Sequence, residues 1–486
     1  ALTVQPLLFR WVITGRAAKG RFPFTLKSFL FSAFAFLYFL IGCIVLLLAL
    51  LVVMPLPLGQ ERKRGVYGRL IMYFTRSLVY VMVNVKKDIQ GFNVSVRERP
   101  AIVIANHSSF VDILVMLMVH PRTIMMVNSW VWRSPFFGAV VRYMGYLRTE
   151  DPVDDNLQRA RDALSRGWSI VIFPEGTRSR TGAIGRFRKG AFHLARELQA
   201  PIIPVLLHGV GYSMAKGDAM LKNGTITMRT LPAIDPKEEV FGMPLKEMTK
   251  AVSLRFKQAY DTLRSDREDP GYFREQVIRN YTYKGPVLEW YVRIKLRIDR
   301  ALDQAIHRAL PRSAAIVDLG CGLGHLDLAL ALSAPDRRIL AVDVDEDKLE
   351  VAKHCFSKPD NLIYQAADLV SYEPPCADAF LMRDVLHYLP RERQRHLLGL
   401  LARSLAPGGR ILVRDGFDDG TRRHKRTQWT ESWSLGLGFN KTRSPLEFPS
   451  VRLLEEVAEE EGLELEELGA AELTSNRLFL LQRRAS

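Results

Sequence analysis

A histidine and an aspartate stand five residues apart in the segment Asn106-His107-Ser-Ser-Phe-Val-Asp112, directly after the apolar run 101–105. Five residues rotate about 500° along one continuous helix, so the two side chains would not share a helix face. They can meet only if the apolar run is a strand and the helix begins near Ser108, with His107 outside it. Asp112 can then accept a hydrogen bond from one imidazole nitrogen, which leaves the other as a general base. The alternative is a purely structural pair.

A turn rich in hydrogen-bond donors follows a second apolar run, 169–173, in the segment Phe-Pro-Glu-Gly-Thr-Arg-Ser. Arg178 can bind a phosphate with both arms of its guanidinium. Gly176 allows the backbone to approach a ligand closely. Taken alone, this segment could equally be a basic surface loop.

Together, NHSSFVD and FPEGTRSR resemble the hallmark motifs of the glycerolipid acyltransferases of the lysophosphatidic acid type, and the resemblance covers about residues 65–260. It implies that His107 deprotonates an acceptor hydroxyl or amine, which attacks the acyl thioester of acyl-carrier protein or acyl-CoA, while Asp112 orients the imidazole. The acceptor would be held by Arg148, Glu175, Gly176, Thr177 and Arg178. The segment around Arg148 differs from the usual second motif of the family, so the acceptor stays open.

A glycine-rich turn follows a third apolar run in Val317-Asp-Leu-Gly-Cys-Gly-Leu-Gly324. Glycines at every second position let the backbone pass close to a ligand. Carboxylates also end the next two predicted strands, and one of them suits a ribose diol. The residues of this set are Asp318, Gly320, Gly322, Gly324, Asp343 and Asp368.

This series resembles the class I S-adenosylmethionine-dependent methyltransferases over about residues 300–486. The resemblance implies that Asp318 and the glycines face the methionine part of S-adenosyl-L-methionine. Asp343 would take the ribose hydroxyls, and Asp368 would lie near the adenine amine. The rival is a dinucleotide oxidoreductase, whose pattern G-x-G-x-x-G is absent here.

The segment Arg-Asp-Val-Leu-His-Tyr matches the next strand end of the methyltransferase family. Asp384 or His387 could contact the methyl acceptor or act as a base. The alternative is that His387 only caps a helix. The residues do not identify the methyl acceptor.

The elements that must position these residues begin with an apolar run that has no charged residue from Ser28 to Gln60. A bilayer takes about 20 apolar residues to cross. Both flanks are basic, so a re-entrant hairpin or a spanning helix followed by a second helix would fit. Residues 66–85 offer that second helix, which we expect to be interfacial. Its predicted apolar stripe is Leu70, Phe74, Leu78, Val81 and Met82.

Two α/β patterns follow, so the predicted fold class is α/β: N-terminal membrane helices, an acyltransferase domain and a Rossmann-like methyltransferase domain. The first pattern has strands at 101–105, 169–173 and 201–207 and a helix at 157–165. In the second, which starts at Ala315, an acidic helix at 453–468 precedes a final strand at 477–484. The expected divisions are 1–64 (membrane-entering segment), 65–265 (acyltransferase), 266–300 (linker or lid helix) and 301–486 (methyltransferase).

Composition limits the partners. The chain has 486 residues and a net charge of +16, which attracts phosphates, lipid headgroups or acidic carrier proteins. We find no nucleic-acid motif, so membrane lipids and an acyl donor are the expected partners. Four cysteines without a C-x-x-C pair fit a reducing compartment, and no metal site is expected. The expected location is the inner membrane, with both catalytic domains facing the cytoplasm.

The leading hypothesis is one polypeptide that acylates and methylates intermediates of one lipid pathway, because joining two sites raises the local concentration of an intermediate. The rival is a non-catalytic scaffold that places one active domain on the membrane. A third hypothesis concerns the first residues, ALTVQPLLFRWVITGR, which resemble the last membrane segment of a large lipid exporter. The chain would then be the cytoplasmic end of an exporter fusion.

Overall fold

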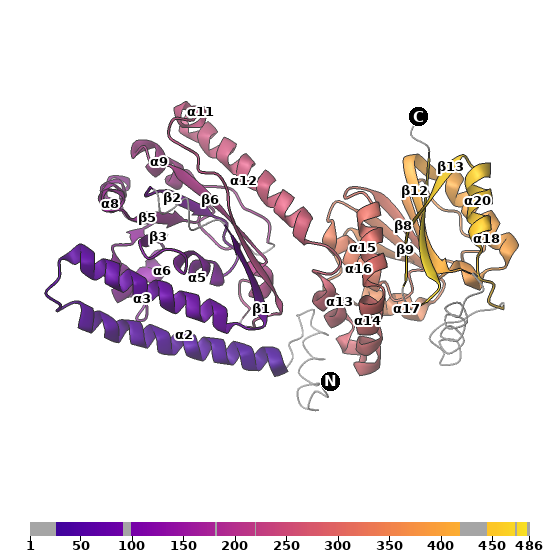
Figure 1. Cartoon of the computed structure of the whole chain (residues 1–486), viewed down its shortest axis with the longest axis horizontal. Coiled ribbons are helices and arrows are strands. Elements are labelled where there is room, and N and C mark those ends of the chain that lie inside the picture. Colours follow the sequence, from indigo (N-terminus) through magenta and orange to yellow (C-terminus); the bar gives the residue numbers. More distant parts are fainter. Residues whose placement is uncertain are drawn as a thin grey trace. The chain divides into compact units, whose positions relative to one another are not determined.

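The computed structural model contains two compact units, Phe24–Arg264 and Ser265–Ser486, which we call the N-terminal and C-terminal units (Figure 1). The described residues are 26–90, 99–179, 182–218, 220–417, 445–471 and 474–483. The segment compared above with a lipid exporter lies outside them. The finer domain boundaries expected from the sequence stay predictions.

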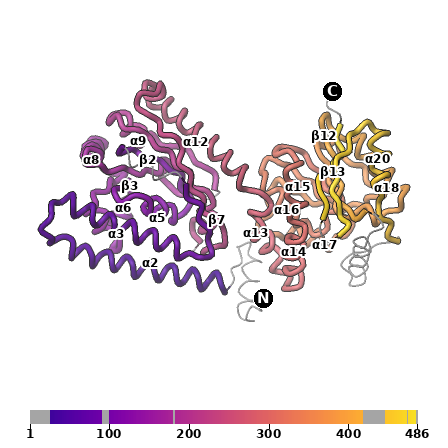
Figure 2. Tube along the Cα trace, in the orientation of Figure 1, coloured from indigo at the N-terminus to yellow at the C-terminus, as the bar shows by residue number. Residues whose placement is uncertain are grey.

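The apolar run forms one continuous helix, α2 (Leu26–Val53), rather than a hairpin broken within it. A second helix, α3 (Gln60–Val81), lies beside it (Figure 2), and the Tyr67 hydroxyl donates to the Leu46 carbonyl at 2.8 Å. By length and composition α2 can cross a bilayer, and only 17% of its most apolar window is buried. Its outer face exposes many large apolar side chains, among them Leu30, Leu37 and Leu48.

The second helix differs from its prediction in its bounds. It begins at Gln60, before the expected Val66, and ends at Val81, because the chain becomes extended in β1 from Val85. Within the predicted apolar stripe, Leu78 and Met82 are buried and Leu70 is exposed. The buried residues of α3 are Tyr67, Gly68, Ile71, Thr75, Leu78 and Val79.

The N-terminal unit is built on a seven-stranded sheet with the order β1-β7-β6-β2-β5-β3-β4, in which β6 and β7 are antiparallel and all other neighbours are parallel. The predicted strands at 101–105, 169–173 and 201–207 are confirmed as β2, β5 and β6. Every residue of these three is buried, as in parallel sheets covered on both faces. Because β2 and β5 are adjacent and parallel, the loops that follow them open at the same edge.

The strands of this unit are β1 (Val85–Gln90), β2 (Ile102–Ala105), β3 (Thr123–Val127), β4 (Leu147–Arg148), β5 (Ser169–Ile172), β6 (Ile202–His208) and β7 (Gly224–Thr230). Its further helices are α5 (Val111–Leu117), α6 (Ser129–Trp132), α7 (Gly138–Met144), α8 (Val153–Ser165), α9 (Gly190–Glu197), α10 (Val210–Ser213), α11 (Glu239–Gly242) and α12 (Leu245–Arg267). The helix predicted at 157–165 is the second part of α8.

The C-terminal unit has a second seven-stranded sheet with the order β10-β9-β8-β11-β12-β14-β13. Its strands are β8 (Ala315–Leu319), β9 (Arg338–Asp343), β10 (Leu362–Ala366), β11 (Ala377–Arg383), β12 (Leu405–Gly416), β13 (Leu463–Ala470) and β14 (Asn476–Arg483). Strand β14 is antiparallel to both neighbours, and the other pairs are parallel. The strand order reverses between β8 and β11, and open α/β sheets bind ligands at the carboxyl ends of the strands at such a point.

The helices of this unit are α13 (Arg274–Asn280), η1 (Thr282–Lys284), α14 (Pro286–Ile298), α15 (Arg300–Ala309), α16 (His325–Ser333), α17 (Glu346–Lys353), η2 (Leu386–Tyr388), α18 (Arg391–Arg403) and α20 (Val451–Glu460). The prediction of a single acidic helix at 453–468 is wrong, because the helix α20 ends at Glu460. The chain leaves α20 through Gly462, which has φ +67°, and continues as β13. From Leu463 to Glu466 leucine and glutamate alternate, a period-2 pattern that pairing with β14 favours over the helix.

A buried arginine closes the end of α15. The guanidinium of Arg337 donates to the backbone carbonyls of His307, Leu310 and Pro311, and its Nη1 lies 3.1 Å from His307 Nδ1. Burial and the neighbouring guanidinium lower the pKa of His307 to about 4. The folded chain therefore keeps this imidazole neutral.

We predict that His307→Asn flattens the pH dependence of stability. The unfolded chain takes up a proton below pH 6.5 and the folded chain only near pH 4, so the free energy of unfolding falls as the pH drops through this window. Because asparagine does not titrate, the variant should lose about 2–3 kcal/mol less of its free energy of unfolding over this pH range than the wild-type chain loses. Chemical denaturation of the full chain in detergent at several pH values measures it. Equal pH slopes for both proteins would contradict the assignment.

Candidate active sites

The predicted pair His107 and Asp112 meets in the structure. The imidazole Nδ1 lies 3.0 Å from Asp112 Oδ2, and the aspartate is fully buried. The same oxygen accepts the backbone N–H groups of Ser108 at 2.6 Å and Ser109 at 2.7 Å. These bonds fix a turn ahead of the helix. Helix α5 therefore begins at Val111 and not near Ser108 as expected.

A cavity of about 360 Å³ opens beside the His107 ring. Its apolar walls come from both N-terminal helices and from the segments around α5, α6 and α7. They include Phe39, Phe74, Phe110, Ile113, Val131 and Val140. The polar end is formed by His107, Gly176, Thr177, Arg178 and Lys216. The imidazole therefore lies where an apolar cavity meets a group of hydrogen-bond donors.

Glu175 ties this loop to the end of β2. Its Oε1 accepts the His107 N–H at 2.8 Å, and its Oε2 accepts the Gly185 N–H at 2.7 Å. Burial raises the pKa of Glu175, and the two amide donors oppose that rise. Both oxygens thus bind backbone amides, which gives Glu175 a positioning role, and the contact with the acceptor that the sequence predicted stays a prediction.

The turn itself needs its glycine. Gly176 has φ +70°, and a Cβ there would stand 2.8 Å from Arg188 Nε. Any side chain would therefore be strained and would meet the arginine. This packing places Thr177 and Arg178 at the cavity.

The structure does not bring Arg148 to this cavity. It lies on β4, the edge strand of the sheet, where its Nε is 3.5 Å from Asp151 and 3.6 Å from Glu150. Its neighbour Thr149 lines the cavity instead. The expected contact of Arg148 with the acceptor has no support in this geometry.

Sequence reasoning missed Lys216, which follows α10. Its Nζ lies 3.3 Å from the Thr177 hydroxyl and 3.3 Å from the Arg178 carbonyl oxygen. It thus adds a second cation beside Arg178 at the polar end of the cavity. Nothing marks this lysine in the sequence except its place shortly after the strand at 201–207.

The predicted glycine turn after β8 has three glycines in the left-handed region. Gly320, Gly322 and Gly324 have φ of +78°, +58° and +65°. A Cβ on Gly320 would stand 2.3 Å from Val385 Cγ2, and one on Gly324 would stand 2.4 Å from the Tyr364 hydroxyl. A Cβ on Gly322 would meet nothing within 4 Å. Two glycines are therefore required by packing, and the middle one borders open space.

The carboxylates around this turn have different surroundings. Asp343 Oδ2 accepts the Gly322 N–H at 2.6 Å and so fixes the turn, while its Oδ1 accepts the Asp345 N–H at 2.8 Å. Asp318 is buried and interacts with the side chain of Asp327, and no other described residue donates a hydrogen bond to its oxygens. Burial, with the nearby Asp327, raises the pKa of Asp318. Asp368 is exposed beyond the end of β10, where it accepts the Val370 N–H.

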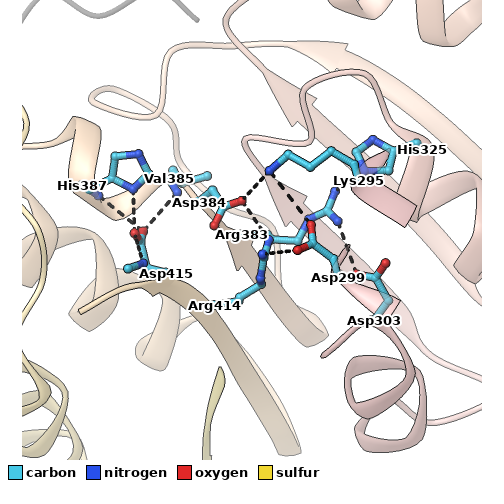
Figure 3. A network of polar contacts seen from close by, with 11 residues as sticks. Lys295, Asp299, Asp303, His325, Arg383, Asp384, Val385, His387, Arg414 and Asp415 are labelled. Carbon is cyan, nitrogen blue, oxygen red and sulfur yellow. Dashed lines mark hydrogen bonds and ion pairs between the residues drawn. The ribbon is translucent and has the colours of Figure 1, made fainter. Parts of the chain in front are cut away.

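Asp384 lies at the end of β11 in a buried ion network (Figure 3). Its Oδ2 is 2.8 Å from Arg414 and 3.4 Å from Lys295, and Arg414 also binds Asp299 at 2.7 Å. Although burial opposes its ionisation, the charges of Arg414 and Lys295 hold the pKa of Asp384 well below its usual range. Asp384 also has φ +57°, a strained conformation for a residue with a Cβ.

His387 is buried and paired with a carboxylate (Figure 3). Its Nδ1 lies 2.6 Å from Asp415 Oδ1, while Asp415 Oδ2 accepts the Val385 N–H at 3.2 Å. The ring stacks on Phe448. Its place within the short turn η2, before α18 begins at Arg391, does not fit the helix cap considered from the sequence.

Both sites lie within segments that match known protein families. The family model described as "Acyltransferase" matches residues 84–208, and the one described as "Methyltransferase domain" matches residues 316–409. The chain joins an acyltransferase domain to a methyltransferase domain. The acyltransferase match contains His107, Asp112 and the loop of Glu175, and the methyltransferase match contains the glycine turn and His387.

Curated relatives match the acyltransferase domain. The 1-acyl-sn-glycerol-3-phosphate acyltransferase BAT2 of Brassica napus is 31% identical over 38% of this chain and 56% of its own length. The human 1-acyl-sn-glycerol-3-phosphate acyltransferase alpha is 26% identical over 38% of this chain and 67% of its own length. The chain thus spans little more than half of the Brassica relative.

A solved structure, the 1-acyl-sn-glycerophosphate acyltransferase PlsC of Thermotoga maritima, is similar over 49% of this chain and 96% of its own, with 22% identity and a TM-score of 0.43.

We predict that Glu175→Gln lowers the free energy of unfolding by about 1–3 kcal/mol. Glutamine keeps one oxygen, so the N–H of His107 or of Gly185 loses its acceptor in a buried site. The exposed Glu247→Gln on α12 is the matched control and should change stability by less than about 0.5 kcal/mol. Thermal unfolding of the full chain in detergent compares them. Equal stabilities of both variants would rule out a stabilising role for the bonds of Glu175 to the His107 and Gly185 amides.

Proposed function

We propose that the chain is a membrane-associated bifunctional enzyme that transfers an acyl chain to a lipid acceptor and a methyl group to an intermediate of the same pathway. The observation that carries the proposal is the imidazole of His107, oriented by Asp112 at the mouth of an apolar cavity. Matches to an acyltransferase and a methyltransferase family support the two activities.

For acyl transfer, Asp112 accepts the Nδ1–H of His107, which leaves Nε2 as the base. Nε2 takes the proton of the acceptor hydroxyl or amine as its oxygen or nitrogen attacks the carbonyl carbon of the acyl thioester. The carbon–sulfur bond then breaks, and the imidazolium returns the proton to the leaving thiolate. The apolar cavity suits the acyl chain, and the step requires no covalent acyl-enzyme.

The acceptor proposed for this site carries an anionic headgroup. Arg178 and Lys216 place two cations at the polar end of the cavity, an arrangement that suits a phosphate. The names of the relatives specify 1-acyl-sn-glycerol-3-phosphate, which makes that lipid the first acceptor to test. The acyl donor is acyl-carrier protein or acyl-CoA.

For methyl transfer, the residues around the glycine turn fit S-adenosyl-L-methionine. Asp318 is buried with the side chain of Asp327 as its one side-chain partner among the described residues and can take the cofactor's ammonium group, and Gly322 borders open space. When bound, the cofactor supplies an electrophilic methyl group on its sulfonium. We assign the ribose hydroxyls to Asp343 and the adenine amine to Asp368.

His387 is the candidate base on the methyl-acceptor side. Asp415 accepts its Nδ1–H and can stabilise the imidazolium, so the ring can take the proton of an acceptor hydroxyl or amine. Asp384 is held by Arg414 and Lys295 and serves better to fix the end of β11 than to take a proton.

We place the chain at the cytoplasmic membrane with both domains in the cytoplasm. The exposed apolar face of α2 supports membrane association, and the net charge of +16 favours anionic lipid surfaces. A scaffold with one inactive domain is the rival function, and separate assays of the two domains distinguish them.

We predict that His107→Ala lowers acyl transfer by at least about 100-fold, since general-base catalysis contributes that much. Binding of S-adenosyl-L-methionine to the same protein should not change. Acylation of 1-acyl-sn-glycerol-3-phosphate by the purified chain in lipid vesicles, with calorimetry for the cofactor, gives both values. Undiminished acyl transfer would exclude His107 as the base.

We predict that Asp343→Asn weakens the binding of S-adenosyl-L-methionine by about 10-fold or more, because an amide keeps one acceptor oxygen for the ribose hydroxyls and for the N–H groups of Gly322 and Asp345. Acyl transfer should stay at the wild-type rate. Loss of both activities in a folded variant would contradict two independent sites.

A further inference from the structure

Helix α14 carries an apolar stripe on its exposed side. Val287, Trp290 and Ile298 are 63%, 54% and 53% exposed, and Ile294 is half-buried between them. Spacings of three and four residues put these four side chains on one face of the helix. The opposite face packs inward through Val292 and Leu296.

Positive charges lie along one flank of the stripe and at its two ends. Lys284, Arg297 and Arg300 are exposed next to it or at its ends, and Arg293 lies partly exposed within the helix. The acidic residue of the helix, Glu289, is paired with Arg293 and Arg279. The exposed surface of α14 is therefore apolar along its centre and cationic along one flank and at its ends.

This combination fits a lipid surface. An amphipathic helix that lies in the bilayer interface presents Trp and aliphatic residues to the acyl boundary and Lys or Arg to the headgroups. Tryptophan prefers that boundary, and each cation near an anionic surface adds attraction. Two of the three strongly exposed side chains of the stripe are aliphatic. A water-soluble protein partner that bound this face would therefore need a surface that is equally apolar and also acidic.

We propose that α14 is an interfacial helix that docks the methyltransferase domain on an anionic bilayer. The proposal is independent of α2, although an anchor at α2 would raise the local concentration of lipid around α14.

Docking would also connect the bilayer to the methyl-acceptor side of the sheet. The inner side of α14 supplies Lys295, which binds Asp384 at the carboxyl end of β11, and His387 follows three residues later. Docking of α14 on the bilayer assigns the methyl acceptor to lipids presented at the membrane surface. This assignment rests on the proposed methyl transfer.

A spin label at position 287 tests the docking on the full chain. Of the four thiols, Cys376 is exposed and the other three are buried, so Val287→Cys is made in a Cys376→Ser background. The exposed Glu455→Cys on α20 is the matched control. Both proteins are placed in vesicles of phosphatidylglycerol mixed with phosphatidylcholine and in vesicles of phosphatidylcholine alone. Collisions with oxygen, which enters the bilayer, are compared with collisions with a water-soluble nickel chelate.

In the anionic vesicles, the label at 287 should collide several-fold more with oxygen and several-fold less with nickel than the label at 455. Adding Lys284→Gln, Arg297→Gln and Arg300→Gln should reduce that difference. Equal nickel collisions at 287 and 455 would overturn the proposal. Shielding from both reagents that persists in detergent would also overturn it, since it would mark a protein contact.

A label at the exposed Leu40 of α2, read in the same vesicles, separates the two membrane claims. Lipid contact at 287 with none at Leu40 would keep the role of α14 and remove the anchor. Methyl transfer is not part of the readout, so a failure of the proposed activity would not affect this result.

Discussion

The arrangement of the acyltransferase domain depends on one oxygen of the Asp112 carboxylate. That oxygen accepts two backbone amides and faces the Nδ1 of His107 at 3.0 Å. The amides fix the turn between β2 and α5, and the imidazole contact sets which nitrogen faces the cavity. Charge-assisted hydrogen bonds of this kind are among the stronger ones in proteins, and here they stabilise the turn and orient the base together.

A second carboxylate joins the two loops of the site. Because β2 and β5 are neighbours in the sheet, the loops that follow them lie close together, and Glu175 binds the His107 amide across that gap. The methyltransferase domain uses the same device, since Asp343 at the end of β9 holds the amide of Gly322 in the turn after β8. In both domains two neighbouring strands bring their following loops close together. A buried carboxylate from one strand end or loop then binds a backbone amide of the other and fixes its conformation.

Much of this could be predicted from the sequence. Continuous apolar runs located β2, β5 and β6, and the five-residue spacing already required His107 to lie outside the helix. The start of α5 could not be read from the pattern, because side-chain bonds from Asp112 compete with helical bonds at Ser108 and Ser109.

Three further features depend on tertiary structure. Lys216 reaches Thr177 from a distant part of the chain, and no local pattern carries such a contact. Arg148 is set apart from the cavity by the position of β4 at the sheet edge. The acidic segment after Gly462 has leucines that fit either a helix or a strand, and pairing with β14 decides between them.

The release of thiol from an acyl thioester by the purified chain in vesicles tests the central claim most directly. A base that activates the acceptor, with no covalent acyl-enzyme, predicts thiol release only when an acceptor lipid is present, with one acylated lipid formed for each thiol. Release without an acceptor, as a burst equal to the amount of protein, would show an acyl-enzyme and contradict the role assigned to His107.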